Sequence, residues 1–405
     1  MKDDGDWKKM QPRNKQQVML IGVAESAAPA PSVDRPTDLQ VQFVEDLSTA
    51  DQAAMSVVLK RQGLKNIGNT CYMNAVIQAL RALPEFESAV TSYAGTDRIT
   101  KDLGDVYREL SKSIKTVDPK KFWTSCCLSY SQFLETTDGH LRQHDADEFM
   151  TLLLNHIGNG GLKEIGLFEG RLSTRRHCLE TDFEEDSVTS DTFRKLECHI
   201  DSTISHLLPG VEMSLKGQVE KHSSVLDRDA LYSTETKIEK LPYFLTMQFV
   251  RFFWKASIGD RAKIVRPVQF PMELDVLSLC SAELSEKVKV VRAYDRAVEE
   301  KKSGLEMLDK EASEKALATP QELVKVAPLT NQTGLYELTA IVTHIGMSAD
   351  GGHYIAWAKE EEGWFKYDDD KVTPASESDV GKVDGRGGAQ GHIAYIAIYR
   401  TKPRE

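Results

Sequence analysis

The sequence lacks the features of a disulfide-stapled or membrane-spanning protein. Its 405 residues include only six cysteines, which follow no regular spacing, and no charged and then apolar signal segment opens the chain. No apolar run approaches the roughly 20 residues that a membrane helix needs. We therefore expect an intracellular protein that folds without disulfides and has no membrane partner.

Paired metal ligands are also missing. No Cys-x-x-Cys pair occurs, and Asp368, Asp369 and Asp370 lack the alternate spacing, the glycine and the distal glutamate of a calcium loop. Cys178 and Cys198 flank a variable acidic stretch, but zinc there would require an unusual set of further ligands. The sequence therefore predicts no metal and no cofactor.

Basic residues are in deficit. The chain has 51 Lys and Arg against 62 Asp and Glu, which gives a formal net charge of −11. A protein that tracks phosphates needs a surplus of Lys and Arg on its contact face, so this balance disfavours a nucleic-acid partner and suits a basic protein partner better. The hydrophobic content of 40% is normal for a globular core.

The composition divides the chain into segments. Residues 1–25 hold one short apolar run with no local strand to pair with, and residues 26–58 are rich in Ala, Pro, Ser and Asp, as in a linker. Residues 59–401 open with helical patterns and close with β-rich ones, which predicts an α+β domain with a mostly antiparallel sheet. Within this domain, the Lys/Glu/Ala-rich stretch 281–328 predicts a charged helical insertion.

The best candidate nucleophile is Cys71. It follows a glycine-punctuated turn and begins a predicted helix that Pro84 ends, where unpaired N–H groups and the helix dipole favour a thiolate. Asn66 and Asn69 precede it in a tight loop, so either amide could point at an oxyanion that develops near the Cys71 N–H. A buried cysteine in a turn capped by Asn69 or Thr70 explains the local sequence equally well.

A cysteine nucleophile needs a histidine base and a group that fixes the tautomer of that histidine. His353 begins a predicted strand, and a second strand ends at Asp368 after a turn near 360–362. Because paired positions in a hairpin have a constant index sum, these two residues are expected to be cross-strand neighbours. The alternative is a strand-end histidine beside a solvated acidic turn. His344 and His392 alternate with apolar residues and are interpreted as core or edge residues.

Four ordered motifs resemble those of the ubiquitin-specific proteases, a family of deubiquitinating enzymes. They are GLKNIGNTCYMN (63–74), QHDADEF (143–149), LPYFLTMQFVRF (241–252), and GHY with WFKYDDDKV (352–372). The resemblance implies a papain-like hand with thumb, palm and fingers, and a cysteine protease that cleaves after the C-terminal glycine of ubiquitin. Many members carry paired zinc ligands in the fingers, so the present sequence resembles a zinc-free subgroup.

The resemblance also implies roles for individual residues. By position, Cys71, His353 and Asp368 correspond to the catalytic triad of the family, and Asn66 to its oxyanion-hole residue. Asp369 is a secondary candidate beside them.

The remaining candidates are substrate-binding residues. The resemblance implies that Asp145 binds the substrate tail, which carries arginines in ubiquitin; an N-cap in a capping box with Glu148 is the alternative, and both can hold. Gly352 leaves room for a substrate chain to pass close to the histidine. Gln143 and Tyr354 lie in the same motifs and are assigned to substrate binding with them.

The resemblance extends to proteasome-associated members of the family. Residues 1–25 resemble the end of their ubiquitin-like domain, and the tracts 236–255 and 365–372 also look like them. The implied partners are ubiquitin, ubiquitin conjugates and the 26S proteasome regulatory particle, in cytoplasm and nucleus. Because residues 1–25 have too few strands to close a sheet, we interpret them as a remnant that does not fold independently, and expect impaired docking.

The sequence also allows two other functions. One is a catalytically weak or inactive ubiquitin-binding regulator of the proteasome that keeps the fold without the turnover. The other is a papain-type protease that cleaves an unrelated peptide substrate.

Overall fold

The computed structural model describes residues 61–137, 139–255, 260–303, 310–348, 351–387 and 391–404. The predicted remnant 1–25 and linker 26–58 lie outside these ranges. None of the helices in the described ranges combines the length and apolar composition that a membrane-crossing helix requires.

A group of helices forms the first part of the fold, which we call the thumb. Its members are α3 (Cys71–Arg81), α4 (Pro84–Thr91), α5 (Arg98–Lys112), α6 (Lys120–Ser129) and α7 (Ala146–Asn159), with the short helices η2 (Ser131–Leu134) and η3 (Lys163–Phe168). The first helix ends before the predicted stop at Pro84. That proline instead opens α4, because a proline at the first helical position loses no hydrogen bond there.

An eight-stranded sheet, the palm, forms the second part, in the order β15-β14-β13-β12-β16-β8-β5 with β11 paired to β12. The strands are β5 (Lys195–Cys198), β8 (Phe244–Phe249), β11 (Glu273–Asp275), β12 (Leu335–Ser348), β13 (Gly351–Glu360), β14 (Gly363–Asp368), β15 (Lys371–Ala375) and β16 (Ile393–Thr401). Among the strands described for this sheet, only the β5–β8 pair is parallel. The predicted α+β fold with a mostly antiparallel sheet is confirmed.

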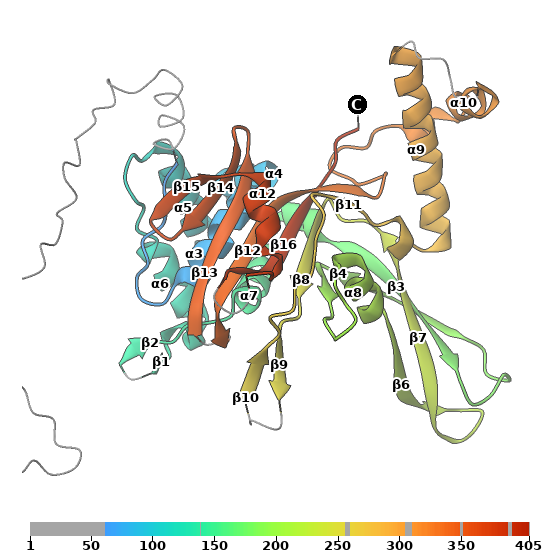
Figure 1. The fold of residues 1–405 in the computed structure, drawn as a ribbon, viewed down its shortest axis with the longest axis horizontal. Helices are drawn as coiled ribbons and strands as arrows, with labels where there is room; N and C mark the ends of the chain where they lie inside the picture. Colours follow the sequence, from blue (N-terminus) through green and yellow to red (C-terminus); the bar gives the residue numbers. More distant parts are fainter. Residues whose placement is uncertain are drawn as a thin grey trace, which may run out of the picture. The chain divides into compact units, whose positions relative to one another are not determined.

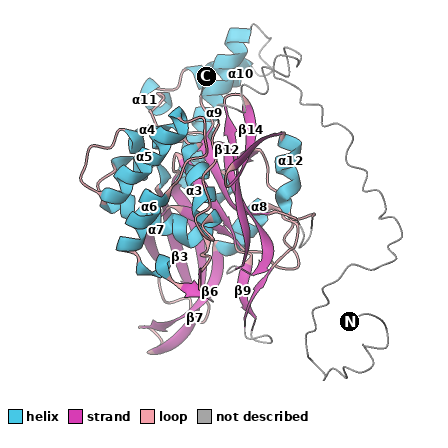
Figure 2. Ribbon diagram, turned by 90° about the vertical axis from the view of Figure 1, so that its left-hand side faces the viewer, coloured by secondary structure: helices cyan, strands magenta, loops and turns pink. Residues whose placement is uncertain are grey.

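Both faces of the palm are covered. Successive residues of a strand point to opposite faces, so Val342 packs with the thumb helices while Ile341 packs with the second core. That second core includes residues of α8 (Leu207–Ser214) and α12 (Glu377–Gly381). Figure 2 shows the thumb helices on one side of the sheet and α8 and α12 on the other. The palm is therefore a central layer with side chains packed on both of its faces.

A second, four-stranded antiparallel sheet extends away from the palm and forms the fingers (Figure 1). Its strands are β3 (Gly170–Cys178), β4 (Ser187–Phe193), β6 (Lys216–Ser223) and β7 (Arg228–Lys240). Cys178 packs with Ala230 and Tyr232 in a small core, whereas Cys198 lies in the palm core. The two cysteines considered as zinc ligands are therefore in separate clusters.

The described part of the stretch 281–328 contains three helices and short connections. Its helices are α9 (Ala282–Ser303), α10 (Lys310–Leu317) and α11 (Gln321–Val324), and Figure 1 shows α9 and α10 projecting from the palm. Short connecting helices are η4 (Leu277–Leu279) and η5 (Lys382–Asp384), and two-stranded hairpins are β1 (Thr136–Thr137) with β2 (His140–Leu141) and β9 (Phe252–Lys255) with β10 (Asp260–Lys263).

Candidate active site

Cys71 is the first residue of α3 and lies where the thumb meets the palm, with α3 packed against β13. Its residue is 2% exposed, and it forms no disulfide. Thr70, at the N-cap position, makes no side-chain capping bond to the helix, and the Asn69 amide donates to the Leu141 carbonyl instead. Neither Asn69 nor Thr70 therefore provides the side-chain cap that the alternative interpretation of this turn requires.

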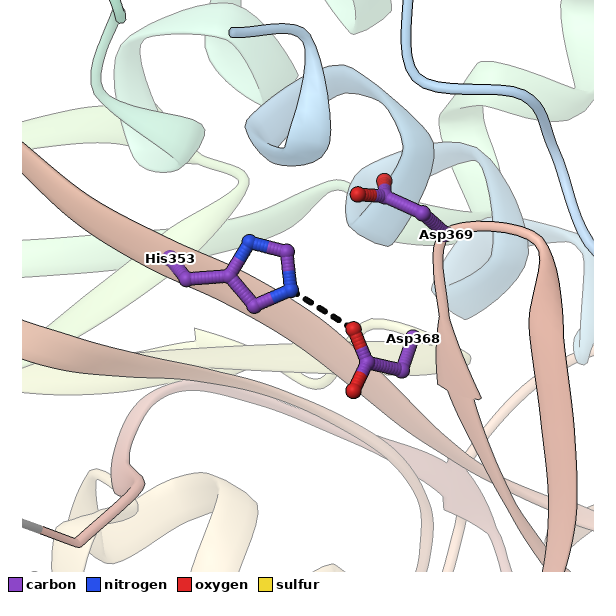
Figure 3. Close-up of side chains that lie close together, drawn as sticks. All are labelled: His353, Asp368 and Asp369. Carbon is purple, nitrogen blue, oxygen red and sulfur yellow. Dashed lines mark hydrogen bonds and ion pairs between the residues drawn. The ribbon is translucent and has the colours of Figure 1, made fainter. Parts of the chain in front are cut away.

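His353 and Asp368 meet across the β13–β14 hairpin, as its sequence register predicts. Ala356 pairs with Tyr367 and Glu360 with Gly363, so the turn lies at 361–362. The His353 Nε2 and the Asp368 Oδ1 are 2.6 Å apart (Figure 3). Because Nε2 is held by Asp368, Nδ1 is the ring nitrogen left for Cys71.

The charge of His353 is stabilised by both partners. A hydrogen bond with the Cys71 side chain is the main influence that raises the pKa of His353 to about 9, and Asp368 adds to it while burial opposes it. Burial works against ionisation of Asp368 as well, but its bond with His353 keeps the pKa of that carboxyl below its ordinary value. An imidazolium beside a cysteine sulfur is the resting arrangement that a thiol protease uses.

The two neighbouring histidines have the opposite tendency. Burial, reinforced by the Lys263 ammonium, lowers the pKa of His344 to about 3, and burial lowers that of His392 to about 4. His344 is fully buried and accepts from Lys263 Nζ at Nδ1, 2.9 Å away. Neither residue competes with His353 for a proton at neutral pH, in keeping with their interpretation as core or edge residues.

Asp369 joins the nucleophile loop to the histidine hairpin. Its two carboxylate oxygens accept from the Asn66 Nδ2 at 2.9 Å and the Asn74 Nδ2 at 2.8 Å, and its carbonyl accepts from the Leu64 N–H at 2.8 Å. A side chain at Gly63 would overlap this backbone, since a Cβ there would lie 2.3 Å from the Asp369 carbonyl oxygen. Glycine is therefore needed for the close approach of the two segments.

Asn66 is held in one orientation by these contacts. Its Oδ1 accepts from the N–H groups of Gly68 and Thr70, at 3.0 and 3.2 Å, while its Nδ2 donates to Asp369. An amide fixed in this way has a second Nδ2 hydrogen in a set direction, as an oxyanion donor requires.

One group of potential metal ligands occurs in the described part of the chain. His353, Asp368 and Asp369 place one ligand atom each within 4.8 Å of one another. His353 and Asp368 already bond to each other, and Asp369 already accepts from the Asn66 and Asn74 amides. The cluster is therefore explained by the arrangement of the candidate triad.

Asp145 caps α7, as one of its two interpretations predicts. Its Oδ1 accepts from the N–H groups of Asp147 and Glu148, and its Oδ2 accepts from the Tyr395 hydroxyl at 2.6 Å. Glu148 does not make the reciprocal bond of a capping box, because its carboxylate accepts from the Gln132 amide instead. The substrate-binding role of Asp145 stays a prediction.

The other substrate-binding candidates lie in different surroundings. Gln143 is 6% exposed, and its Nε2 donates to the Cys71 sulfur at 3.7 Å. Gly352 has a φ of +129°, and a Cβ there would lie 2.1 Å from the Ile345 carbonyl oxygen, so the neighbouring strand already requires glycine. Tyr354 is 1% exposed and packs beside its ring neighbours in the core. Its burial favours a supporting role over direct substrate contact.

Sequence reasoning missed three residues that build the site. Asn74 lies one helical turn after Cys71, a spacing that could have indicated it. Tyr395 and Lys263 carry no local signal, because their partners Asp145 and His344 are 250 and 81 positions away in the chain.

Comparisons with known proteins agree with this geometry. The family model described as ubiquitin carboxyl-terminal hydrolase matches residues 62–399. Ubiquitin carboxyl-terminal hydrolase 6 of Arabidopsis thaliana is 37% identical over 99% of this chain and 89% of its own length. The namesake from Schizosaccharomyces pombe is 36% identical over 84% of this chain and 78% of its own length. Ubiquitin carboxyl-terminal hydrolase 14 of Caenorhabditis elegans is 29% identical over 98% and 83%.

The family model covers well over half of the chain and spans both the cysteine and the histidine segments. The α+β hand and the cysteine at the thumb–palm junction are what a thiol protease of this type requires. The chain belongs to the ubiquitin carboxyl-terminal hydrolase family and is a cysteine-type deubiquitinase.

Proposed function

We propose that the chain hydrolyses the peptide or isopeptide bond that follows the C-terminal glycine of ubiquitin, with Cys71, His353 and Asp368 as its catalytic residues. The observation that carries this proposal is the connected set of side chains at the thumb–palm junction. Cys71 is the main influence that raises the pKa of His353, and the His353 Nε2 lies 2.6 Å from the Asp368 Oδ1.

The steps follow from the chemistry of these groups. The Cys71 thiolate attacks the glycine carbonyl carbon, and the resulting oxyanion is stabilised by the Asn66 amide and the Cys71 N–H. His353, protonated at Nδ1, gives its proton to the departing lysine amine, leaving a thioester. Water then attacks the thioester with His353 as the base. Asp368 holds Nε2 throughout and so keeps Nδ1 directed at the sulfur.

The test of this proposal is hydrolysis of ubiquitin that carries a fluorogenic amide at its C-terminus. We expect turnover by the unaltered chain and none by Cys71→Ala, because no other group in the site can form the thioester. Cys127→Ala is the matched control: Cys127 is buried in α6, where burial raises the pKa of its thiol to about 11. Full activity of the Cys71→Ala variant would contradict the proposal.

We further propose that the substrates are ubiquitin conjugates held by the 26S proteasome, in cytoplasm and nucleus. The support is the resemblance of residues 1–25, 236–255 and 365–372 to proteasome-associated family members. Co-sedimentation of the chain with purified 26S proteasome tests this partner. Because residues 1–25 are expected to impair docking, even weak retention on the particle supports the proposal. Free migration at micromolar concentrations of both contradicts it.

A further inference from the structure

The Cys71 sulfur has a second neighbour besides His353. The Gln143 amide nitrogen, Nε2, donates to Sγ at 3.7 Å, and the two residues are 6% and 2% exposed. His353 comes from the palm, whereas Gln143 comes from the loop that leads into α7. The nucleophile therefore lies beside a base and beside a neutral N–H donor that arrive from different elements.

The loop that carries Gln143 is fixed at both ends. On one side, the Leu141 carbonyl accepts from the Asn69 amide at 2.8 Å, which ties the loop to the turn before Cys71. On the other side, Asp145 caps α7 and accepts from a tyrosine of β16. His144, next in the chain, packs its ring against two aromatic rings of the thumb. The loop that carries Gln143 is thus held in place before any substrate binds.

The oxyanion donor expected from the sequence is partly occupied. Asn66 uses its Oδ1 to bind the turn and one Nδ2 hydrogen to bind Asp369, which leaves a single amide hydrogen for substrate. Charge that develops on a carbonyl oxygen is commonly stabilised by more than one preorganised donor. The site can therefore use a second donor to the oxyanion, and the Gln143 amide lies beside the sulfur that attacks the carbonyl.

We propose that Gln143 is a catalytic residue that donates its Nε2–H to the oxyanion. In the free enzyme this hydrogen rests on the Cys71 sulfur. When the thiolate forms its bond to the glycine carbonyl carbon, the carbonyl π electrons move to oxygen, and the hydrogen bond passes from sulfur to that oxygen. When the oxyanion collapses, the C–N bond breaks and the amine leaves with the proton of His353. The inference rests on the proposed function of the same site.

The chemistry of an amide limits the other roles that Gln143 can have. A side-chain amide neither accepts nor releases a proton in the working pH range, so it is neither the base nor the acid. A residue that binds substrate equally in the ground and transition states changes KM when it is removed, whereas an oxyanion donor changes kcat. A residue that only holds the thiolate changes every reaction of the sulfur.

The experiment compares the unaltered chain with Gln143→Met, which keeps the length of the side chain and removes its donors. Gln132→Met is the matched control, because the Gln132 amide likewise donates to a side chain of the thumb, Glu148, at 3.2 Å. Two reactions are measured: hydrolysis of the fluorogenic ubiquitin amide, and alkylation of Cys71 by ubiquitin ending in a 2-bromoethylamide. In the second reaction sulfur displaces bromide, so no oxyanion forms.

For Gln143→Met we expect kcat to fall by about 10²–10³-fold, with KM and the alkylation rate nearly unchanged. Normal alkylation also shows that the variant is folded. Gln132→Met should match the unaltered chain in all three quantities. The inference is overturned if kcat is unaffected, if only KM rises, or if alkylation slows as much as hydrolysis. Absence of both reactions in the unaltered chain would instead contradict the proposed function itself.

Discussion

At the scale of single residues, the proposed mechanism depends on the proton that His353 carries. Its pKa of about 9 is higher than the ordinary value of 6.5, chiefly because of Cys71, with Asp368 as a second contributor. A pKa that is higher in the folded state stabilises the fold fully below pH 6.5, and this contribution is lost as the pH rises through about 9. The proposed mechanism uses the same proton for the leaving amine.

We therefore predict that substitution of Asp368 changes the pH profile of kcat/KM. Asp368→Asn keeps an acceptor for the Nε2–H but removes the charge, so the alkaline limb of kcat/KM should move to lower pH. Asp368→Ala removes the acceptor as well and should lower kcat further, by at least about tenfold. The measurement is kcat/KM for the fluorogenic ubiquitin amide from pH 6 to 10. This range includes both the ordinary pKa of histidine, 6.5, and the raised pKa of His353, about 9. Identical alkaline limbs in all three proteins would contradict this role.

Some of these residue contacts could be predicted from the sequence, and others could not. His353 and Asp368 are 15 positions apart in one hairpin, so their meeting follows from strand register alone. Gln143 and Cys71 are 72 positions apart, and Asn74 and Asp369 are 295 apart. The first pair depends on how the elements of the thumb pack together and the second on how the thumb packs on the palm, and no local pattern specifies either arrangement.

At the scale of elements, the strand that carries His353 depends on the glycine before it. β12 and β13 change register between Ile345 and Ser348, and this irregularity brings the Ile345 carbonyl against Gly352. The sequence indicated that glycine lets a substrate chain pass, whereas the structure shows the adjacent strand in the nearest space. The bulge was not predictable because alternation in sequence does not report register shifts.

Gly352→Ala should therefore be much more disruptive than Gly363→Ala. Both glycines have a φ near +130°, at +129° and +128°, but only Gly352 has heavy atoms that a Cβ would overlap, while nothing lies within 4 Å at Gly363. We expect a loss of about 1 kcal/mol of unfolding free energy at Gly363 and at least about 2 kcal/mol at Gly352. Urea unfolding of the two variants measures this. Equal losses would show that the overlap at Gly352 is relieved without cost.

At the N-terminus of α7, one carboxylate caps the helix and is predicted to bind the substrate as well. Asp145 binds two helix N–H groups with one oxygen and the Tyr395 hydroxyl with the other. The sequence indicated both a cap and a substrate contact, and the structure describes the first. Substitutions that separate shape from charge can test the second.

Asp145→Asn keeps a good cap but removes the charge, so the unfolding free energy should change little while KM for the ubiquitin amide rises about tenfold, the equivalent of about 1.4 kcal/mol. Asp145→Ala should in addition destabilise the fold by about 1–3 kcal/mol, because the helix loses its cap and the tyrosine its acceptor. Thermal unfolding and steady-state kinetics measure the two effects. An unchanged KM in Asp145→Asn would restrict Asp145 to capping.

At the scale of the whole molecule, the site exists only because two layers meet. The thumb supplies Cys71 and Gln143, the palm supplies His353 and Asp368, and Asp369 ties the two together through Asn66 and Asn74. The fold class could be predicted from helical patterns followed by β-rich ones, and the four motifs marked the segments that converge. Their closeness in space required the structure.

The most direct test of the central claim is covalent capture of Cys71 by ubiquitin that carries a C-terminal electrophile, followed by mass spectrometry of the adduct. The account predicts one ubiquitin per chain, attached at Cys71, and no adduct in Cys71→Ala. Failure of the unaltered chain to react, or attachment of ubiquitin to one of the other five cysteines, would contradict it.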